Sequence, residues 1–386
     1  MAVRANPRLV DDLQRYGAED VSKCFHCGNC TAACQLSESS FLFPRRAMRA
    51  LQMGLEDRLR SSLDPWLCYY CGDCSEQCPR GADPGETMMS MRRWLTAQYD
   101  FTGLAKLFYR SPAAHVAAMI ALSLLTGGGF VAYALLRGGS LSVYDGAQAF
   151  LPERAVHVFD WGMGGLLLAL LLANAFRMWR FTMLSERAPR VSPLAYLRHF
   201  FLLPVHFFTQ RRYRQCKSTG SWGIHLALML SYVTMLVLIV FFLPQMQHGP
   251  EVNWGVHAFG YLAAIGLLVG TIVMLRGRLR RTAAHHKHSH PSDWIFLVML
   301  LALTVTGIVQ HVLHRAGLPL AANVAYLAHL MVIAPFELTQ VPFGKWSHMA
   351  YRPLAMYFAR IQAAARASAE ATAPAGDQAA ASLRPV

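Results

Sequence analysis

Charged residues are scarce in this sequence. They make up 15% of the 386 residues, whereas apolar residues make up 54%, and the mean hydropathy is positive. Soluble globular domains carry about 25% charged residues. The shortage therefore argues against an ordinary soluble protein and predicts several membrane spans in a chain long enough for two or three domains.

An apolar stretch is also missing from the first 25 residues, which contain Asp11, Asp12, Glu19 and Asp20. Its absence argues against a secretory signal peptide and predicts an N-terminus in the cytoplasm. The net charge of +14 is compatible with nucleic-acid binding. However, most Lys and Arg residues lie in short segments between apolar stretches, as in cytoplasmic loops. We therefore expect no nucleic-acid partner.

Six apolar stretches follow a polar region of about 100 residues, and each can cross about 30 Å of hydrocarbon as a helix. They lie at 113–136, 155–178, 222–243, 255–275, 293–315 and 322–341. The loop at 179–221, the loop after 275 and the segment after 341 are basic, whereas 244–253 and 316–321 contain no Lys or Arg. The positive-inside rule then predicts a multi-pass protein of the inner (cytoplasmic) membrane with both termini in the cytoplasm.

Cysteine is almost absent outside two short runs, which hold eight of the nine cysteines. In each run the cysteines are separated by two, two and three residues. This spacing is typical of two-cluster ferredoxins, in which the fourth cysteine of each run ligates the other cluster. The runs are Cys24, Cys27, Cys30 and Cys34, then Cys68, Cys71, Cys74 and Cys78, followed by Pro79.

The spacing predicts two [4Fe–4S] clusters. One is assigned to Cys24, Cys27, Cys30 and Cys78, and the other to Cys68, Cys71, Cys74 and Cys34. Zinc is the alternative, but it prefers two separated pairs of cysteines around one ion. Gly28 and Gly72 are expected where the chain turns closely around each cluster. Cys216, outside both runs, is interpreted as an ordinary loop cysteine.

Histidines within apolar spans are costly unless they are paired or bind a metal. His225 begins the third span, His329 lies in the sixth, and His348 follows it. Two imidazoles on helices of a bundle can hold a low-spin haem. On one straight helix, His329 and His348 would lie about 28 Å apart, near opposite leaflets. His257, His311 and His157 are further candidates, for which an interfacial polar role is the alternative.

Two other polar features in the second half are open to interpretation. The histidine-rich run at 285–290 could bind a metal, but in a basic loop it is interpreted as a solvated, positive segment. Glu337, inside the sixth span, is either a proton relay for a quinone or a paired structural carboxylate.

Most of residues 20–360 resembles the C subunits of the quinone-interacting membrane-bound oxidoreductases. Its first half resembles the C subunit of heterodisulfide reductase in Cys24-Phe-His-Cys-Gly-Asn-Cys-Thr-Ala-Ala-Cys and Cys68-Tyr-Tyr-Cys-Gly-Asp-Cys-Ser-Glu-Gln-Cys-Pro. Its second half resembles the E subunit of heterodisulfide reductase and the haem-binding gamma subunit of respiratory nitrate reductase. That resemblance rests on His225, His329, His348 and the stretch Lys345-Trp-Ser-His-Met-Ala-Tyr-Arg352.

The residues and the resemblance together predict a mostly α chain with three parts. These are a small two-cluster ferredoxin-type domain at 1–105, a six-helix transmembrane haem b bundle at 106–360 and a disordered tail at 361–386. His225 and His348 are expected to ligate haem b near the cytoplasmic face. His329 is expected to ligate a second haem near the outer face, with His257 preferred to His311 as its partner. Met235 and Gln210 replace histidines expected in relatives, so the count stays at one haem or two.

The resemblance also implies partners. These are a quinone pool, two soluble flavin and iron–sulfur proteins (the A and B subunits of the same complex), and adenylylsulfate reductase of dissimilatory sulfur metabolism. No catalytic residue is predicted in this chain, which is expected to be a redox subunit of an oxidoreductase complex. Two alternatives remain: a fused C/E subunit of a heterodisulfide or thiol reductase, and a membrane anchor without haem.

Overall fold

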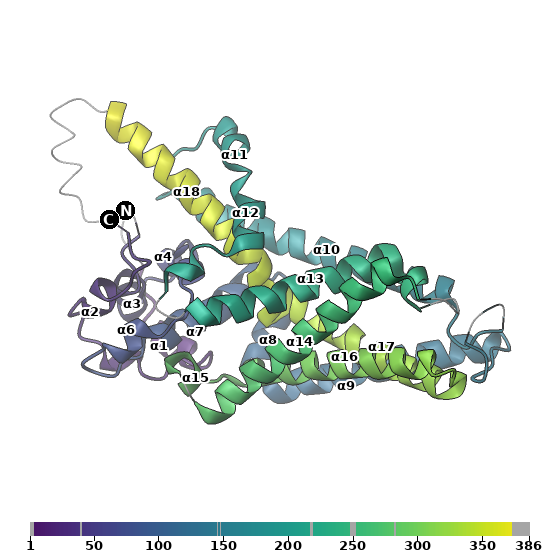
Figure 1. The fold of residues 1–386 in the computed structure, drawn as a ribbon. Helices are drawn as coiled ribbons and strands as arrows, with labels where there is room; N and C mark the ends of the chain where they lie inside the picture. The colour runs from purple at the N-terminus through teal and green to yellow at the C-terminus, as the bar shows by residue number, and fades with distance from the viewer. Residues whose placement is uncertain are drawn as a thin grey trace.

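The computed structural model describes residues 4–38, 41–144, 146, 148–216, 219–247, 252–281 and 283–372. Within these residues the chain is mostly helical, and its only β-type pairings are two isolated bridges. A cysteine-rich domain of short helices lies at one end of a bundle of long helices (Figure 1). The predicted fold class is thereby confirmed: a mostly α chain with a ferredoxin-type domain before six transmembrane helices.

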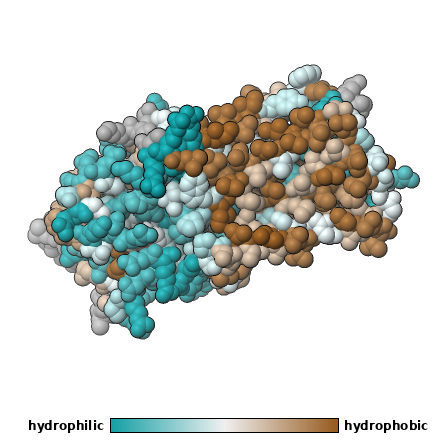
Figure 2. Space-filling model, turned by 90° about the horizontal axis from the view of Figure 1, so that it is seen from below, coloured by the Kyte–Doolittle hydropathy of each residue, from teal (hydrophilic) through white to brown (hydrophobic). Residues whose placement is uncertain are grey.

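Six helices of the bundle are long and apolar enough to cross a membrane. They are α9 (Pro112–Leu136), α10 (Glu153–Met183), α13 (Thr219–Gln247), α14 (Trp254–Arg280), α16 (Pro291–Arg315) and α17 (Pro319–Phe343). Each contains one of the six predicted spans. Their outer surface is largely apolar and adjoins the hydrophilic surface of the cysteine-rich end (Figure 2), as expected for a protein embedded along part of its length.

The cysteine-rich domain consists of short helices joined by turns. They are α1 (Leu9–Gln14), the 3-10 helix η1 (Val21–Lys23), α2 (Asn29–Ala32), α3 (Arg45–Gln52), α4 (Glu56–Arg60), α5 (Asp64–Leu67), α6 (Asp73–Glu76) and α7 (Pro84–Tyr99). Between α3 and α4 the chain turns at Gly54, whose carbonyl accepts a hydrogen bond from the Asn6 amide at 2.7 Å. Helices α3 and α4 are therefore separate.

One hydrophobic core joins this domain to the bundle. It contains Trp66 and Trp94 of the domain together with Met178 of α10 and Phe343 of α17. Trp66 also packs against Tyr351, with 5.0 Å between ring centres. Helix α8 (Leu104–Arg110) contributes to the same core, so the predicted domain boundary at 105 falls inside a packed helix.

Shorter segments surround the junction between domain and bundle. They are α11 (Pro193–His199), α12 (Leu202–Thr209), η2 (Tyr213–Gln215), α15 (Ala284–Lys287), η3 (Lys345–Ser347) and α18 (His348–Thr372). Helices α11 and α12 lie beside α18, which leaves the bundle at an angle (Figure 1). The predicted tail begins inside α18: residues 361–372 are helical, and 373–386 lie outside the described residues.

The chain between His329 and His348 is not one straight helix, so the separation estimated for them on that assumption is corrected. Helix α17 runs through Pro335 and ends at Phe343, one residue after Pro342. Gly344 then takes an extended conformation (φ −111°, ψ −155°), and the chain passes through η3 before α18 begins at His348. The two histidines therefore lie on different helices.

Candidate functional site

The two cysteine runs have the same backbone conformation. His26 and Tyr70, each just before the second cysteine, have φ of 61° and 56°, and Gly28 and Gly72, just after it, have φ of 89° and 93°. The short helices α2 and α6 begin directly after these glycines. Glycine adopts positive φ without the strain that a Cβ brings, so both runs can turn tightly around the same kind of ligand.

Electrostatic interactions sort the thiols into two sets. Cys30 interacts with Cys24, Cys27 and Cys78. Cys34 interacts with Cys68 and Cys71. Cys74 interacts with Cys68, Cys71 and Cys34, and least with Cys30. The fourth cysteine of each run thus lies near the first three of the other run, which is the crossed arrangement that two-cluster ligation requires.

The chemistry of these sulfurs suits a cationic metal cluster. Burial, followed by the neighbouring Cys68, raises the pKa of Cys34 to about 12. Burial also raises the pKa of Cys74. Such thiols become thiolates when a metal replaces their protons. Among the described residues no three His, Cys, Asp or Glu side chains are grouped closely enough for one metal ion.

Cys216 lies against the second set of thiols, so its interpretation as an ordinary loop cysteine is wrong. It is buried, and its side chain is hydrogen-bonded to that of Cys71. This contact lowers the pKa of Cys71 and raises that of Cys216. No local pattern indicates this contact, because the two residues are far apart in the chain.

An aromatic bridge leads from the second set of thiols to the bundle. Tyr69, next to Cys68, stacks on Tyr213 with 4.8 Å between ring centres and 20° between planes. Tyr213 in turn meets the ring of His225 edge-on at 5.9 Å. The second thiol set and His225 are therefore joined by two rings in contact.

His225 of α13 and His348 of α18 face each other. Their ring centres are 5.8 Å apart, with planes at 64°. A metal ion bound by both rings would have a metal–nitrogen bond of about 2 Å on each side. These two bonds and the two ring radii add up to about the distance observed between the ring centres. Nδ1 of His225 lies 2.8 Å from Oε1 of Gln210, and Nδ1 of His348 is hydrogen-bonded to the carbonyl of Lys345. These acceptors favour a proton on Nδ1 and leave each Nε2 free for a metal.

Two cavities meet at this histidine pair, and both are lined by His225, His348, Tyr69 and Arg352. The larger lies between the cysteine-rich domain and the bundle and encloses about 1080 Å³, including the part open to solvent. Its lining is rich in cationic side chains. The smaller, about 300 Å³ by the same measure, is lined on its other sides mainly by apolar residues, among them Phe207 and Met356.

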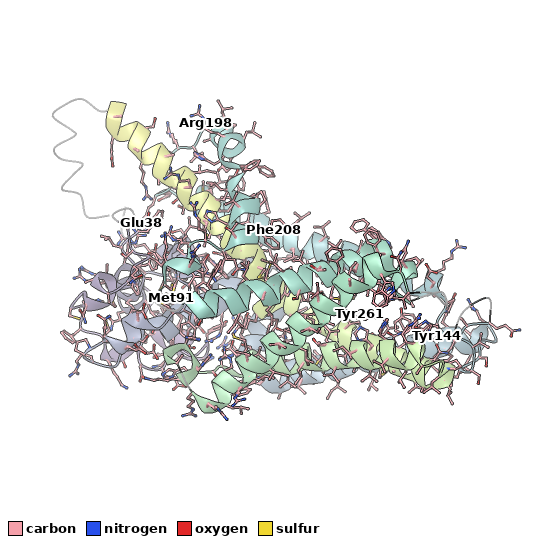
Figure 3. All side chains as sticks on the ribbon, viewed as in Figure 1. Glu38, Met91, Tyr144, Arg198, Phe208 and Tyr261 are labelled. Atoms are coloured by element: carbon pink, nitrogen blue, oxygen red, sulfur yellow. The ribbon has the colours of Figure 1, made fainter. Side chains whose placement is uncertain are left out.

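The other candidate histidines form a second group in the bundle. His257 and His311 lie 5.6 Å apart between ring centres. Nδ1 of His257 is 2.9 Å from the carbonyl of Asn253, and its buried Nε2 has no partner among the described residues. Tyr261, labelled in Figure 3, is hydrogen-bonded to His311 at 3.1 Å.

His329 is not brought against this pair. Its Nδ1 lies 2.9 Å from the hydroxyl of Thr306, and no ring contact joins it to His257 or His311 among the described residues. His157 pairs with Glu153 at 3.5 Å instead of facing another candidate. The structure therefore brings together His225 with His348 and His257 with His311, and leaves His329 apart from both pairs.

The histidine-rich segment packs against the cysteine-rich domain, which corrects its interpretation as a solvated loop. His285 is hydrogen-bonded to the backbone of Cys71, and its ring meets Tyr70. His288 lies 2.7 Å from a carboxylate oxygen of Asp83. These contacts hold the segment against the domain. The partners are distant in sequence, so the local composition of the segment does not indicate them.

A buried ionic group ties the same junction together. Asp293, at the start of α16, contacts Arg93 of α7 at 3.4 Å, Arg278 of α14 at 3.7 Å and the ammonium of Lys345. Glu86 contacts Arg93 at 2.8 Å. In the bundle, the Tyr232 hydroxyl donates to Glu337, a contact that is compatible with both sequence interpretations of this carboxyl group.

Comparison with known proteins identifies relatives of the cysteine-rich part. Residues 20–82 match the family of 4Fe-4S dicluster domains. The chain is 35% identical over 99 residues to a protein of Archaeoglobus profundus that is described as like the C subunit of heterodisulfide reductase, covering 25% of this chain and 53% of that protein. It is 32% identical over 119 residues to the second iron–sulfur C subunit of the CoB–CoM heterodisulfide reductase of Methanocaldococcus jannaschii, covering 29% and 61%.

These matches concern only part of each protein. The chain spans about half the length of the curated relatives it matches. No solved structure matches it significantly. The comparisons therefore support an iron–sulfur domain related to the C subunit of heterodisulfide reductase, followed by a membrane-spanning helical region.

Proposed function

We propose that this chain is the membrane subunit of an oxidoreductase complex and links a quinone pool to soluble flavin and iron–sulfur subunits. Two [4Fe–4S] clusters and haem b, when bound, would supply the one-electron carriers. The eight cysteines of the two runs would hold the clusters, and His225 with His348 would hold haem b. His257, His311 and His329 are the residues available for a second haem.

The observation that carries this proposal is the contact between the two candidate sites. Tyr69 and Tyr213 connect the residue next to Cys68 with the ring of His225. A membrane anchor without haem does not require two imidazoles whose Nδ1 atoms are hydrogen-bonded and whose ring centres are about as far apart as ligation of one metal ion requires. The contact supports a relay between membrane and soluble domain over a short distance.

The residues around the sites control water and orientation. Gln210 and the Lys345 carbonyl orient the two imidazoles. Tyr69 and Tyr213 are both buried and cover the second thiol set on the side of the bundle. Exclusion of water from cluster sulfurs and hydrogen bonds to them both shift a cluster's reduction potential, and the thiol of Cys216 provides such a hydrogen bond.

The first thiol set is the natural contact point for soluble partners. Cys27 is exposed, and the ring of Phe25 beside it is 58% exposed, with the guanidinium of Arg80 lying 5.8 Å from the ring centre. We infer that the A and B subunits dock here in the cytoplasm and exchange electrons with adenylylsulfate reductase. The positive-inside rule supports this placement, because basic loops lie at the same end as the cysteine-rich domain.

A fused C/E subunit of a heterodisulfide reductase is the second candidate. The names of the relatives matched by the cysteine-rich part favour it. The disulfide chemistry would then belong to a partner subunit, and the relay through this chain would be the same. Copurification decides between the two: adenylylsulfate reductase favours the first, and a thiol-disulfide reductase favours the second.

The purified chain is expected to contain about eight iron and eight sulfide per molecule, the content of two cubane clusters. It should also show the reduced-minus-oxidised optical spectrum of low-spin haem b. Iron, acid-labile sulfide and haem assays on one preparation measure all three. Zinc with negligible sulfide would refute the clusters, and an absent haem signal would leave only the membrane anchor.

Replacing Gln210 by Ala removes the acceptor that orients His225. Outer contacts of this kind typically change metal affinity by about 10–100-fold, so we expect the haem to dissociate that much faster from the variant. Transfer of haem to apomyoglobin measures the rate. Gln215→Ala, in the same loop, is the control and should keep the wild-type rate. Equal rates for both variants would show that Gln210 does not orient a ligand.

A further inference from the structure

We propose that the cationic cavity beside His225 and His348 binds the two propionate carboxylates of the haem. This inference rests on the proposed function and adds a carboxylate-binding site that orients the cofactor. The residues that carry it are Arg92 of the cysteine-rich domain, Arg278 of α14 and Arg352 of α18.

The charges around the cavity do not balance. Its lining contains five cationic side chains, Arg92, Arg93, Arg278, Lys345 and Arg352, and one carboxylate, Asp293. Glu86 adds a second carboxylate behind Arg93. Buried charge is costly unless opposite charge compensates it. An occupant with two negative charges would remove most of the excess.

Two of these cations, Arg92 and Arg352, contact no carboxylate among the described residues, although both lie near the thiol of Cys68. Arg92 donates to the carbonyls of Pro65, at 2.6 Å, and Cys68. Arg352 donates to the Cys68 carbonyl at 3.2 Å and covers the ring of Tyr69. The buried Nε atoms of Arg278 and Arg352 have no hydrogen-bond partner in the described part of the chain. The guanidinium groups thus retain donors for a carboxylate ligand.

The smaller cavity at the histidine pair is more apolar. Phe207, Met349, Pro353 and Met356 line it, together with the polar side chains of His206, Gln210 and Arg352. A porphyrin is amphipathic: it carries its two carboxylates on one edge and apolar groups on the others. The carboxylates of a bound haem would suit the cationic cavity, and its apolar groups would suit the apolar side chains of the smaller one. The structure therefore favours a haem over the headgroup of an anionic lipid, because a headgroup contains no metal that the two imidazoles could ligate.

The test compares haem with haem dimethyl ester, whose propionates carry no charge. The full chain, prepared without haem and held in detergent, is titrated with each form, and binding is followed by the low-spin spectrum. The wild type is expected to bind haem about 10-fold or more tightly than the ester. In Arg352→Gln and in Arg278→Gln this preference should fall towards one, while the low-spin spectrum persists.

Matched controls are Arg280→Gln on α14 and Arg360→Gln on α18, both exposed, which should retain the wild-type preference. If Arg278→Gln fails to fold because Asp293 loses a partner, Arg352→Gln still tests the proposal. An unchanged preference for haem over its ester in Arg352→Gln overturns this inference alone. Equal wild-type affinity for both forms, as expected if the cavity binds a lipid, does the same. A wild-type chain that binds neither form overturns the proposed haem function as well.

Discussion

Replacing His348 by Ala is expected to abolish the signal of the haem nearest the iron–sulfur domain. The substitution removes one of two imidazoles whose rings face each other at 5.8 Å, and no other histidine ring is in contact with His225 among the described residues. Reduction of the clusters by a quinol should fall to the background rate. The optical difference spectrum measures the first effect and the electron paramagnetic resonance of the reduced clusters the second.

His157→Ala is the matched control for that experiment. His157 is also partly buried and lies on a long helix, but it pairs with Glu153 instead of a second imidazole. This variant should keep the haem spectrum and the quinol-driven reduction. If His348→Ala also kept both, the histidine pair would not hold a haem, whatever the fate of the second histidine group.

Replacing Cys71 by Ala is expected to remove one cluster and reduce the iron content from about eight to about four per chain. Cys71 interacts with Cys34 in the second thiol set, and an iron that loses its thiolate exposes the cluster to loss. The domain should also unfold more readily, because metal ligation contributes to its folding energy. Iron and sulfide assays give the stoichiometry, and thermal unfolding gives the stability.

The variant Cys216→Ser tests whether Cys216 ligates the second cluster or only lies beside Cys71. The serine hydroxyl can still donate to the sulfur of Cys71, and Cys216 belongs to neither predicted ligand set, so this variant should keep about eight iron. A loss of four iron in Cys216→Ser but not in Cys71→Ala would mean that Cys216 is the true fourth ligand of the second cluster. That outcome would contradict the ligand assignment while leaving two clusters in place.

The sequence predicts the features that depend on local pattern. The six spans follow from hydropathy, because a helix in a membrane must be apolar over its length. The turns at Gly28 and Gly72 follow from the cysteine spacing, and both glycines have a positive φ, which disfavours a side chain. The cysteine ligand sets and the haem histidines remain predictions that the experiments above address.

The contacts that sequence reasoning missed join segments far apart in the chain. Cys216 contacts Cys71, and His288 contacts Asp83, across long stretches of intervening sequence. Nothing in the local composition around either residue indicates its partner. The break at Gly344 was missed for another reason: His329 and His348 were treated as lying on one straight helix, whereas that helix ends at Phe343 and Gly344 is extended.

The core shared by the cysteine-rich domain and the bundle has a consequence for the speed of electron transfer. Trp66, Phe343 and Tyr351 are packed in one interior, so the domain has no hinge at the boundary where a tethered shuttle would need one. If the chain relays electrons as proposed, transfer across the junction would take place over a fixed distance and would not wait for diffusion of a mobile head. Its rate should then be insensitive to solvent viscosity, so that only the docking of soluble partners and the exchange of quinone would depend on diffusion.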